Sequence, residues 1–245
     1  MFNNMKFYDY YSPNYSRKKR PEKSIKIIVI HYTGMQSERE SLLRLSNPKS
    51  KVSSHFLINQ TGKIYRLIKE KQIAWHAGKS CWGKYVNLNK NSIGIELENR
   101  GHRFGYTNFK SKQLLTLTKI CKLLMKKYKI KKKNIIGHSD IAPLRKIDPG
   151  EKFPWKNLAA KGVGIWHQSK PSLLRRYRKV KIFKKEDKIK FIRNLNKIGY
   201  CTFNQKKYFF TKILKAFQRH FRKELISGFL DKECLIIAEN LSKKL

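Results

Sequence analysis

Acidic residues are scarce in this sequence: 16 Asp and Glu stand against 57 Lys and Arg, which gives a formal net charge of +41. Such an excess suits a protein that meets nucleic acid or another polyanionic surface. A compositional bias toward Lys, Asn, Ile, Phe and Tyr accounts for the same charge, and neither explanation is favoured. Charge alone therefore assigns no function, and no nucleic-acid partner is predicted.

Long apolar runs are absent as well. No run reaches the ~20 residues needed to cross a bilayer, so no integral membrane segment is predicted. The N-terminal stretch holds aromatic residues and then four consecutive basic residues, 17–20, without the apolar centre of a secretory signal. Taken by itself, this absence favours the cytoplasm.

Cysteine is also rare. Cys81, Cys121, Cys201 and Cys234 lie far apart, and none forms a Cys-x-x-Cys pair. This excludes a cysteine-rich metal signature, and no disulfide framework can be inferred from the spacing. Cys121 falls on an apolar helical pattern, so we expect it to be a buried thiol.

The most informative segment that is present spans residues 137–150. Its two prolines and final glycine prevent a continuous helix, so we expect a loop shaped by turns. Such a loop can aim His138 and Asp148 at one point, and this nitrogen and oxygen pair suits zinc. A third ligand could be His31, at the C-terminal end of an apolar strand. Three protein ligands would leave a position open for water, as in catalytic zinc sites, although a lone strand histidine is more often a core residue.

Five blocks of sequence, in one order along the chain, carry a family resemblance. They are VIHYT at 29–33, VSSHFLI at 52–58, AWHAG at 74–78, SIGIELEN at 92–99 and the loop from His138 to residue 150. Together they resemble the zinc N-acetylmuramoyl-L-alanine amidases of the AmpD/AmiD type, which are related to peptidoglycan recognition proteins. Residues 99–101 and 153–166 are closer to the AmiD branch.

The resemblance implies a site with distinct roles for its residues. Glu96 matches the catalytic glutamate, which would accept a proton from water, and Glu98, on the same face of the strand by alternation, is its rival. Lys146, two residues before Asp148, is expected to stabilise negative charge that develops on the substrate. Trp75 and His76 are expected to contact substrate.

The implied reaction is hydrolysis of the amide bond between the lactyl group of N-acetylmuramic acid and L-alanine of the stem peptide. One Zn²⁺ per chain would be held by His31, His138 and Asp148, with peptidoglycan or muropeptides as partner. The process would be cell-wall remodelling or recycling. A His, His, Asp ligand set favours an enzyme, and a non-catalytic peptidoglycan-binding protein is the alternative. The sequence does not indicate an oligomeric state.

Three further polar residues are expected to have supporting roles or none. Asp140 is predicted to shape the turn or to support a ligand, and His55 is predicted to be a structural histidine. Arg145 is predicted to be solvated.

Strands that alternate with helices predict an α/β fold, with a central mixed β-sheet flanked by helices and a small C-terminal three-helix module. We expect an irregular lead-in at 1–24, a catalytic domain at 25–166, a basic linker at 167–183 and a helical domain at 184–245. The expected elements are strands ending at 31 and at 97, a helix at 37–45, a hairpin of 52–58 with 64–68, a strand or loop at 73–78, a helix at 114–128 and a strand at 135–136. A polar loop at 80–91 is expected to line a groove with Trp82 and Tyr85.

The C-terminal module is predicted from amphipathic segments at 185–198, 207–221 and 232–245. Residues 195–200 and 216–221 resemble the small helical peptidoglycan-binding domain, while the alternative is a bundle that only packs on the catalytic domain. A binding module favours a polymeric substrate, and we therefore predict the bacterial cell envelope, periplasmic or secreted, over the cytoplasm.

Overall fold

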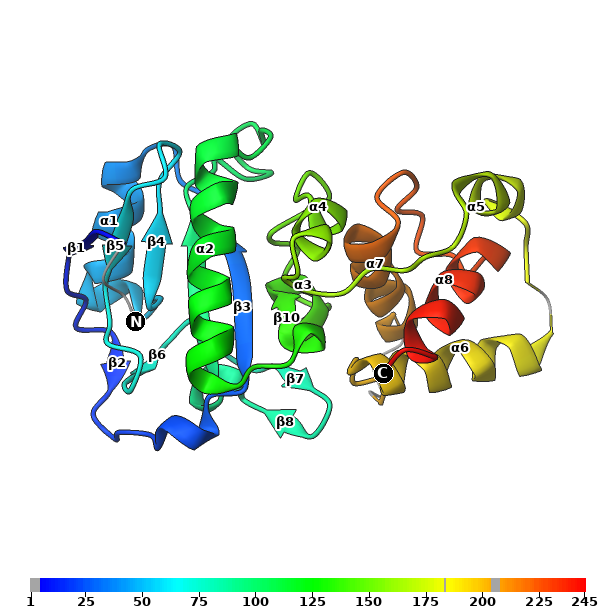
Figure 1. Ribbon diagram of the computed structural model, residues 1–245, viewed down its shortest axis with the longest axis horizontal. Coiled ribbons are helices and arrows are strands. Elements are labelled where there is room, and N and C mark those ends of the chain that lie inside the picture. Colours follow the sequence, from blue (N-terminus) through cyan, green and yellow to red (C-terminus); the bar gives the residue numbers. More distant parts are fainter. Residues whose placement is uncertain (1–4, 183, 204–207) are drawn as a thin grey trace.

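A six-stranded mixed sheet forms the centre of the N-terminal part of the chain in the computed structural model, which describes residues 5–182, 184–203 and 208–245 (Figure 1). The strand order is β1-β5-β4-β9-β3-β10, and every neighbouring pair is parallel except β4 with β5. The strands are β1 (Phe7–Asp9), β3 (Ile27–Tyr32), β4 (Phe56–Ile58), β5 (Ile64–Arg66), β9 (Ser92–Leu97) and β10 (Ile135–Gly137). The predicted α/β class is confirmed.

Helices and two small sheets complete the chain. The strand pairs are β2 (Tyr15–Ser16) with β6 (Ile73–Ala74) and β7 (Cys81–Trp82) with β8 (Tyr85–Val86). The α-helices are α1 (Glu38–Ser46), α2 (Ser111–Tyr128), α3 (His138–Ile141), α4 (Trp155–Ala160), α5 (Pro171–Tyr177), α6 (Lys185–Ile198), α7 (Phe209–Phe221) and α8 (Lys232–Ser242). Short 3₁₀ turns are η1 (Glu22–Ser24), η2 (Pro48–Ser50), η3 (Leu88–Lys90) and η4 (Lys132–Asn134).

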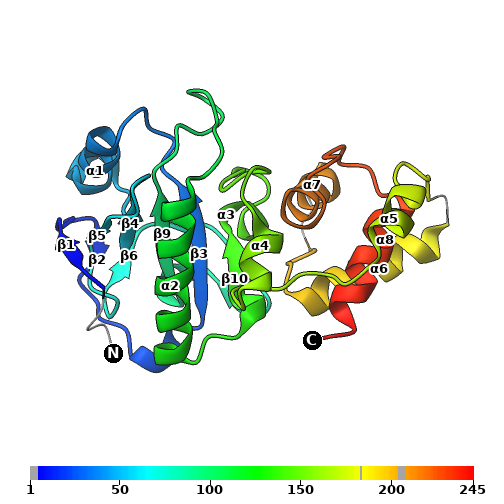
Figure 2. The same cartoon turned by 45° about the horizontal axis from the view of Figure 1, so that its top comes forward.

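The central strands β3 and β9 are apolar because both of their faces are covered. Ile28 and Ile30 of β3 lie in one core cluster with the buried side of α2, which crosses that face of the sheet (Figure 2). Ile27 and Val29 point to the opposite face and join a second core cluster. By alternation His31 belongs to this second face, away from α2.

The C-terminal module packs beside the β10 edge of the sheet, against α3 and α4 (Figure 1). Side chains of α6, α7 and α8 form one continuous cluster with Ile27, Val29 and Ile136. Helix α7 contacts both α3 and α4. The predicted three-helix module is present, and α6 has the predicted bounds. The predicted second segment begins at Lys207, which lies outside the described residues.

The expected lead-in and linker contain more regular structure than the sequence predicted. Strand β1 pairs with β5 and so extends the main sheet, and Arg20 is buried with its guanidinium 2.9 Å from His55 Nε2. In the linker, α5 buries Leu174 in the core cluster of the module. Both segments are short and basic, and their few apolar contacts leave no periodic pattern to read.

The segment at 80–91 also differs from the prediction. It forms the β7–β8 hairpin rather than a loop, and Trp82 is buried against Tyr200, with ring centroids 4.9 Å apart. Trp82 and Tyr85 do line a pocket, as predicted, together with the end of α6. The loop after β10 begins with one helical turn, α3, before the turns that its prolines require.

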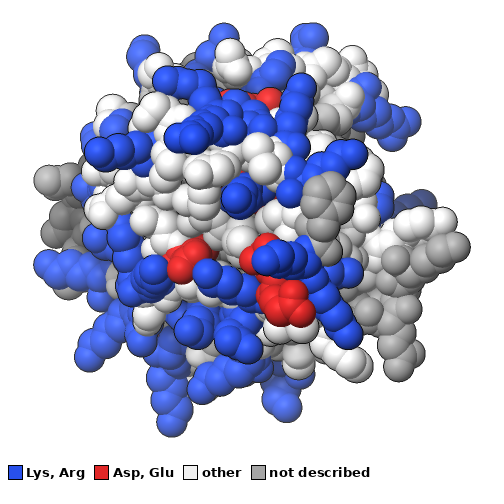
Figure 3. Space-filling model, turned by 90° about the vertical axis from the view of Figure 1, so that its right-hand side faces the viewer, with Lys and Arg blue, Asp and Glu red and all other residues white. Residues whose placement is uncertain are grey.

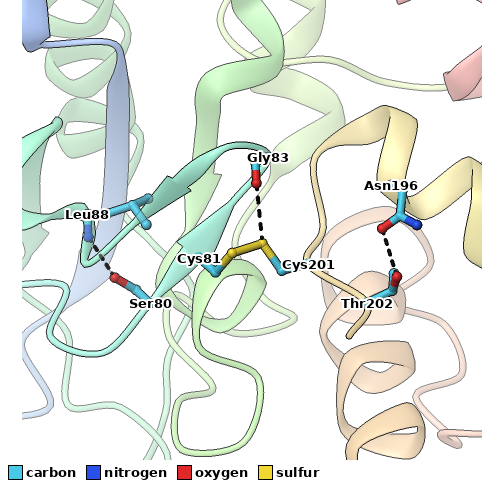
Figure 4. Close-up of a disulfide and its surroundings, with 7 residues drawn as sticks. All are labelled: Ser80, Cys81, Gly83, Leu88, Asn196, Cys201 and Thr202. Carbon is cyan, nitrogen blue, oxygen red and sulfur yellow. Dashed lines mark hydrogen bonds between the residues drawn. A yellow bond between two sulfur atoms is a disulfide. The ribbon is translucent and has the colours of Figure 1, made fainter. Parts of the chain in front are cut away.

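A disulfide joins Cys81 of this hairpin to Cys201, just after α6 (Figure 4). The two residues are separated by 120 positions, and neither spacing nor a motif pairs them in the sequence. Beside the bond, Gly83 N–H donates to the carbonyl of Gly199 at 2.6 Å. Cys121 and Cys234 are buried free thiols, as expected for Cys121.

Basic side chains cover the end of the molecule formed by the C-terminal module, with few acidic groups among them (Figure 3). Within the described ranges, no helix is both long enough and apolar enough to cross a membrane.

Candidate metal centre and active site

Three parallel strands bring the predicted site together at one edge of the sheet. Strands β9, β3 and β10 run in the same direction, so their C-terminal ends meet. In the register of β3 and β9, His31 lies opposite Glu96, and His138 directly follows β10. Open crevices at the carboxyl ends of parallel strands are common ligand sites in α/β folds.

His31, His138 and Asp148 converge there as a buried triangle of ligand atoms. The Nδ1 atoms of the two histidines are 3.0 Å apart, and Asp148 Oδ2 lies 3.0 Å from His31 Nδ1 and 3.1 Å from His138 Nδ1. A tetrahedral zinc with ligand distances of about 2.0–2.1 Å separates its ligands by roughly 3.3 Å. The triangle therefore already has close to the size that a tetrahedral metal needs.

The outer nitrogens of the two imidazoles show where their protons lie. His138 Nε2 is 3.2 Å from the carbonyl of Ala77, which can only accept, and 3.4 Å from Arg145 Nη2, which can only donate. The shorter contact to the carbonyl favours a proton on this nitrogen. Its Nδ1 lone pair then faces the triangle.

A second hydrogen-bond chain sets the tautomer of His31. Ser92 Oγ donates to the carbonyl of Leu88 at 2.6 Å and accepts from His76 Nε2 at 3.1 Å. His76 Nδ1 is thus left to accept from His31 Nε2, also at 3.1 Å. His31 Nδ1, His138 Nδ1 and Asp148 Oδ2 therefore converge as three acceptors without a proton between them. A bound cation stabilises such a group of lone pairs.

The pKa of His31 agrees with this arrangement. Burial, reinforced by the neighbouring His138, lowers the pKa of His31 to about 4, so the ring is neutral at pH 7. Two imidazole nitrogens and one carboxylate oxygen form a donor set that fits zinc.

His76 has a different place from the one expected. It is buried, and its ring fills the space above Gly94, where an added Cβ would lie 2.5 Å from His76 Cγ. Its hydrogen bond to His31 gives it a supporting role that sequence reasoning missed, because residues 31, 76 and 92 share no motif. Direct contact between His76 and substrate stays a prediction.

Glu96 lies beside the triangle with an unsatisfied oxygen. Its side chain lines the same cavity as the three ligand residues, and among the described residues its buried Oε2 has no hydrogen-bond partner. Burial, and next the charge of Asp148, raise the pKa of Glu96 to about 8. A carboxylate with a proton affinity near neutrality and no fixed partner is suited to proton transfer.

The metal-free protein should become more stable when Glu96 is replaced by glutamine, and increasingly so at higher pH. Unfolding returns this carboxyl to a pKa near 4.5, so the unfolded chain releases a proton that the folded chain retains up to pH about 8. Stability of the wild type therefore falls as pH rises between these values. Urea denaturation should give a difference in unfolding free energy below about 1 kcal/mol at pH 5 and about 4 kcal/mol at pH 8. A difference that is independent of pH would contradict the raised pKa.

Glu98 does not share this environment. Its Oε2 accepts a hydrogen bond from the backbone N–H of Gln60 at 3.0 Å, beyond the end of β9. It is absent from the lining of the cavity. Between the two carboxylates considered from the sequence, the geometry favours Glu96.

Lys146 and Trp75 line the same cavity as the three ligand residues His31, His138 and Asp148. The positive charge of Lys146 lowers the pKa of both Glu96 and His31. At Glu96 it partly offsets the rise in pKa that burial causes. Arg145 is exposed, as predicted, and its guanidinium also donates to the backbone carbonyls of Ala77 and Lys79.

Two basic residues of the cavity were not found from the sequence. Arg44, on α1, and Arg103, in the loop after β9, contribute to its lining. In a chain with 57 basic residues, neither stood out by type or spacing.

Comparison with known proteins identifies the family to which this site belongs. A family model described as N-acetylmuramoyl-L-alanine amidase matches residues 21–151. The chain belongs to this amidase family. The match contains every residue of the cavity discussed above, so the predicted family and the predicted enzyme class are both confirmed.

Relatives and solved structures extend the similarity beyond the matched segment. N-acetylmuramoyl-L-alanine amidase AmiD of Escherichia coli is 36% identical over 240 residues, which covers 90% of this amidase and 83% of AmiD. The 1,6-anhydro-N-acetylmuramyl-L-alanine amidase AmpD of Haemophilus influenzae is 33% identical and covers 59% of this chain and 86% of AmpD.

The solved structure of E. coli AmiD with the substrate anhydro-N-acetylmuramic acid-L-Ala-D-gamma-Glu-L-Lys has a TM-score of 0.79 to this amidase at 34% identity. It covers 94% of this chain and 92% of the AmiD chain. AmpDh3 of Pseudomonas aeruginosa gives the same TM-score at 31% identity and covers 95% of this chain and 96% of AmpDh3. The similarity in fold therefore includes the C-terminal module.

Proposed function

We propose that this amidase is a zinc-dependent hydrolase of the bond between the lactyl group of N-acetylmuramic acid and L-alanine of the peptidoglycan stem peptide. The observation that carries the proposal is the triangle of three proton-free ligand atoms with the unpartnered oxygen of Glu96 beside it. AmiD, whose fold is similar, was solved with a substrate that contains this bond.

When bound by His31, His138 and Asp148, zinc supplies the Lewis acidity that activates water and polarises the amide carbonyl. The protein supplies the proton transfers. Glu96 Oε2 accepts a proton from the attacking water and delivers it to the departing nitrogen of L-alanine, so that one water is consumed and an acid and an amine are released.

Lys146 has the charge and position to stabilise the carbonyl oxygen as it becomes negative. Its ammonium belongs to the same cavity as Glu96 and comes from the loop that carries Asp148. Fixed positive charge beside such an oxygen is typically worth a few kcal/mol of transition-state stabilisation. Trp75 offers a half-buried aromatic wall to the substrate at the rim of the cavity.

The bacterial envelope remains the proposed location, with peptidoglycan or its fragments as the partner. The disulfide between Cys81 and Cys201 supports this location, because such bonds persist in oxidising compartments and are rare in the cytosol. The basic surface favours encounter with an anionic wall polymer and would do so less at high salt.

Removal of metal tests the proposal directly. Purified protein should release free stem peptides from muropeptides or whole sacculi. Mass spectrometry measures this release. A chelator should stop the release of stem peptides, and added zinc should restore it, because the metal and not its three ligand residues supplies the Lewis acid that activates water. The better of the two substrates would distinguish recycling from remodelling. Cleavage that continues at full rate in metal-free protein would overturn the proposal, as would the absence of cleavage in protein with confirmed zinc.

A further inference from the structure

Asp140 is the point at which the C-terminal module meets the metal-binding loop. This carboxylate lies two residues after His138 and is 2% exposed. It accepts three hydrogen bonds: from Gly137 N–H at 2.8 Å, from the Tyr200 hydroxyl at 2.6 Å and from His220 Nδ1 at 2.7 Å. A carboxylate buried this deeply is stable only when such donors surround it.

Two of the three donors come from the module, and their rings are held in place. Tyr200 follows α6 and packs on Trp82. His220, on α7, lies between Trp155 and Phe221, with ring centroids 3.8 and 4.0 Å away. Stacked on both faces, the imidazole has little freedom to turn, so its donor is fixed on Asp140.

Asp140 in turn fixes the start of α3, from which the first loop ligand projects. Its bond to Gly137 N–H caps this single helical turn, and the N–H of Ser139, two residues further on, donates to the carbonyl of Asp148 at 2.9 Å. The same carboxylate thus orders the backbone at His138 and, through it, at Asp148.

The disulfide provides a second, covalent constraint on the same assembly. Cys201 adjoins Tyr200, and its partner Cys81 begins the hairpin that follows Ala77 (Figure 4). Ala77 is the residue whose carbonyl accepts from His138 Nε2. The module is therefore tied both to the loop that carries His138 and to the segment that fixes its tautomer.

We propose that Tyr200 and His220 are positioning residues of the active site: through Asp140 they hold the loop that supplies His138 and Asp148. The inference rests on the proposed metal site and adds to it a role for the C-terminal module. It also reinterprets the resemblance of residues 195–200 and 216–221 to a peptidoglycan-binding domain. The side chains of Tyr200 and His220 in these segments face the catalytic domain, not solvent.

The test removes hydrogen bonds but keeps the aromatic rings. Tyr200→Phe and His220→Phe, singly and together, should each lower the affinity for zinc about 10-fold, as expected for partners that orient metal ligands. The double variant should lose more than either single variant. Tyr128→Phe is the matched control, because it makes the same change at a buried tyrosine on the opposite face of the sheet. Competition with a chromophoric chelator measures the affinities.

Two further readouts separate positioning from general stability. The visible spectrum of the Co²⁺-substituted protein should change in the Tyr200 and His220 variants and not in the control, because it reports ligand geometry. With zinc in excess, kcat should fall while KM stays unchanged. Variants with wild-type zinc affinity and Co²⁺ spectrum would overturn this inference alone. A wild type that binds no zinc would instead overturn the proposed function.

Discussion

A Glu96→Gln variant of the amidase is expected to lose about 10²–10⁴ in kcat while it keeps its affinity for zinc. Glutamine has nearly the same shape, but it cannot accept the proton of the attacking water. The triangle of His31, His138 and Asp148 does not include this side chain, so metal binding should be unaffected. Steady-state kinetics on a purified muropeptide, with metal content measured on the same samples, checks both parts.

Glu98→Gln is the matched control for this experiment. It makes the same change two residues along the chain, on a carboxylate that binds Gln60 N–H and lies outside the cavity. Its kcat should stay within a few-fold of wild type. If the large loss appeared in Glu98→Gln and not in Glu96→Gln, the assignment of the proton-transfer group would be reversed.

The sequence predicted the parts of this site that rest on local pattern. An apolar strand that ends in His31 and a proline-containing loop after a second strand are both readable, because alternation and turn residues act over a few positions. Family blocks then connected His31, Glu96 and the loop. The α/β class followed from the same strands and helices.

Features that depend on distant pairing could not be read in this way. The hydrogen-bond chain from Ser92 through His76 to His31 and the clamp of Tyr200 and His220 on Asp140 join residues up to 80 positions apart. Trp82 lines a pocket, as expected, but the packing of its ring on Tyr200, a residue far away in the sequence, could not be predicted from the loop around it. Polar residues with several possible partners are placed by packing, and packing is a property of the folded chain.

Replacing Asp148 by asparagine should lower zinc affinity by at least about 10²-fold and abolish cleavage at ordinary zinc concentrations. Loss of a supporting partner already costs about 10–100-fold, and loss of a direct ligand should cost no less. Asparagine keeps the size of the side chain but removes its negative charge. With two neutral imidazoles left, a doubly charged cation has no compensating anion among the three ligand residues.

Glu151→Gln is the control for Asp148→Asn, since this nearby carboxylate pairs with His102 at 3.1 Å and is outside the triangle. It should retain zinc and activity. Circular dichroism should show Asp148→Asn to be folded, because the substitution removes no buried volume. A folded Asp148→Asn protein that binds zinc as tightly as wild type would exclude Asp148 as a ligand. In that case the third ligand would have to be sought among the other groups of the cavity, of which Glu96 is the nearest in chemistry.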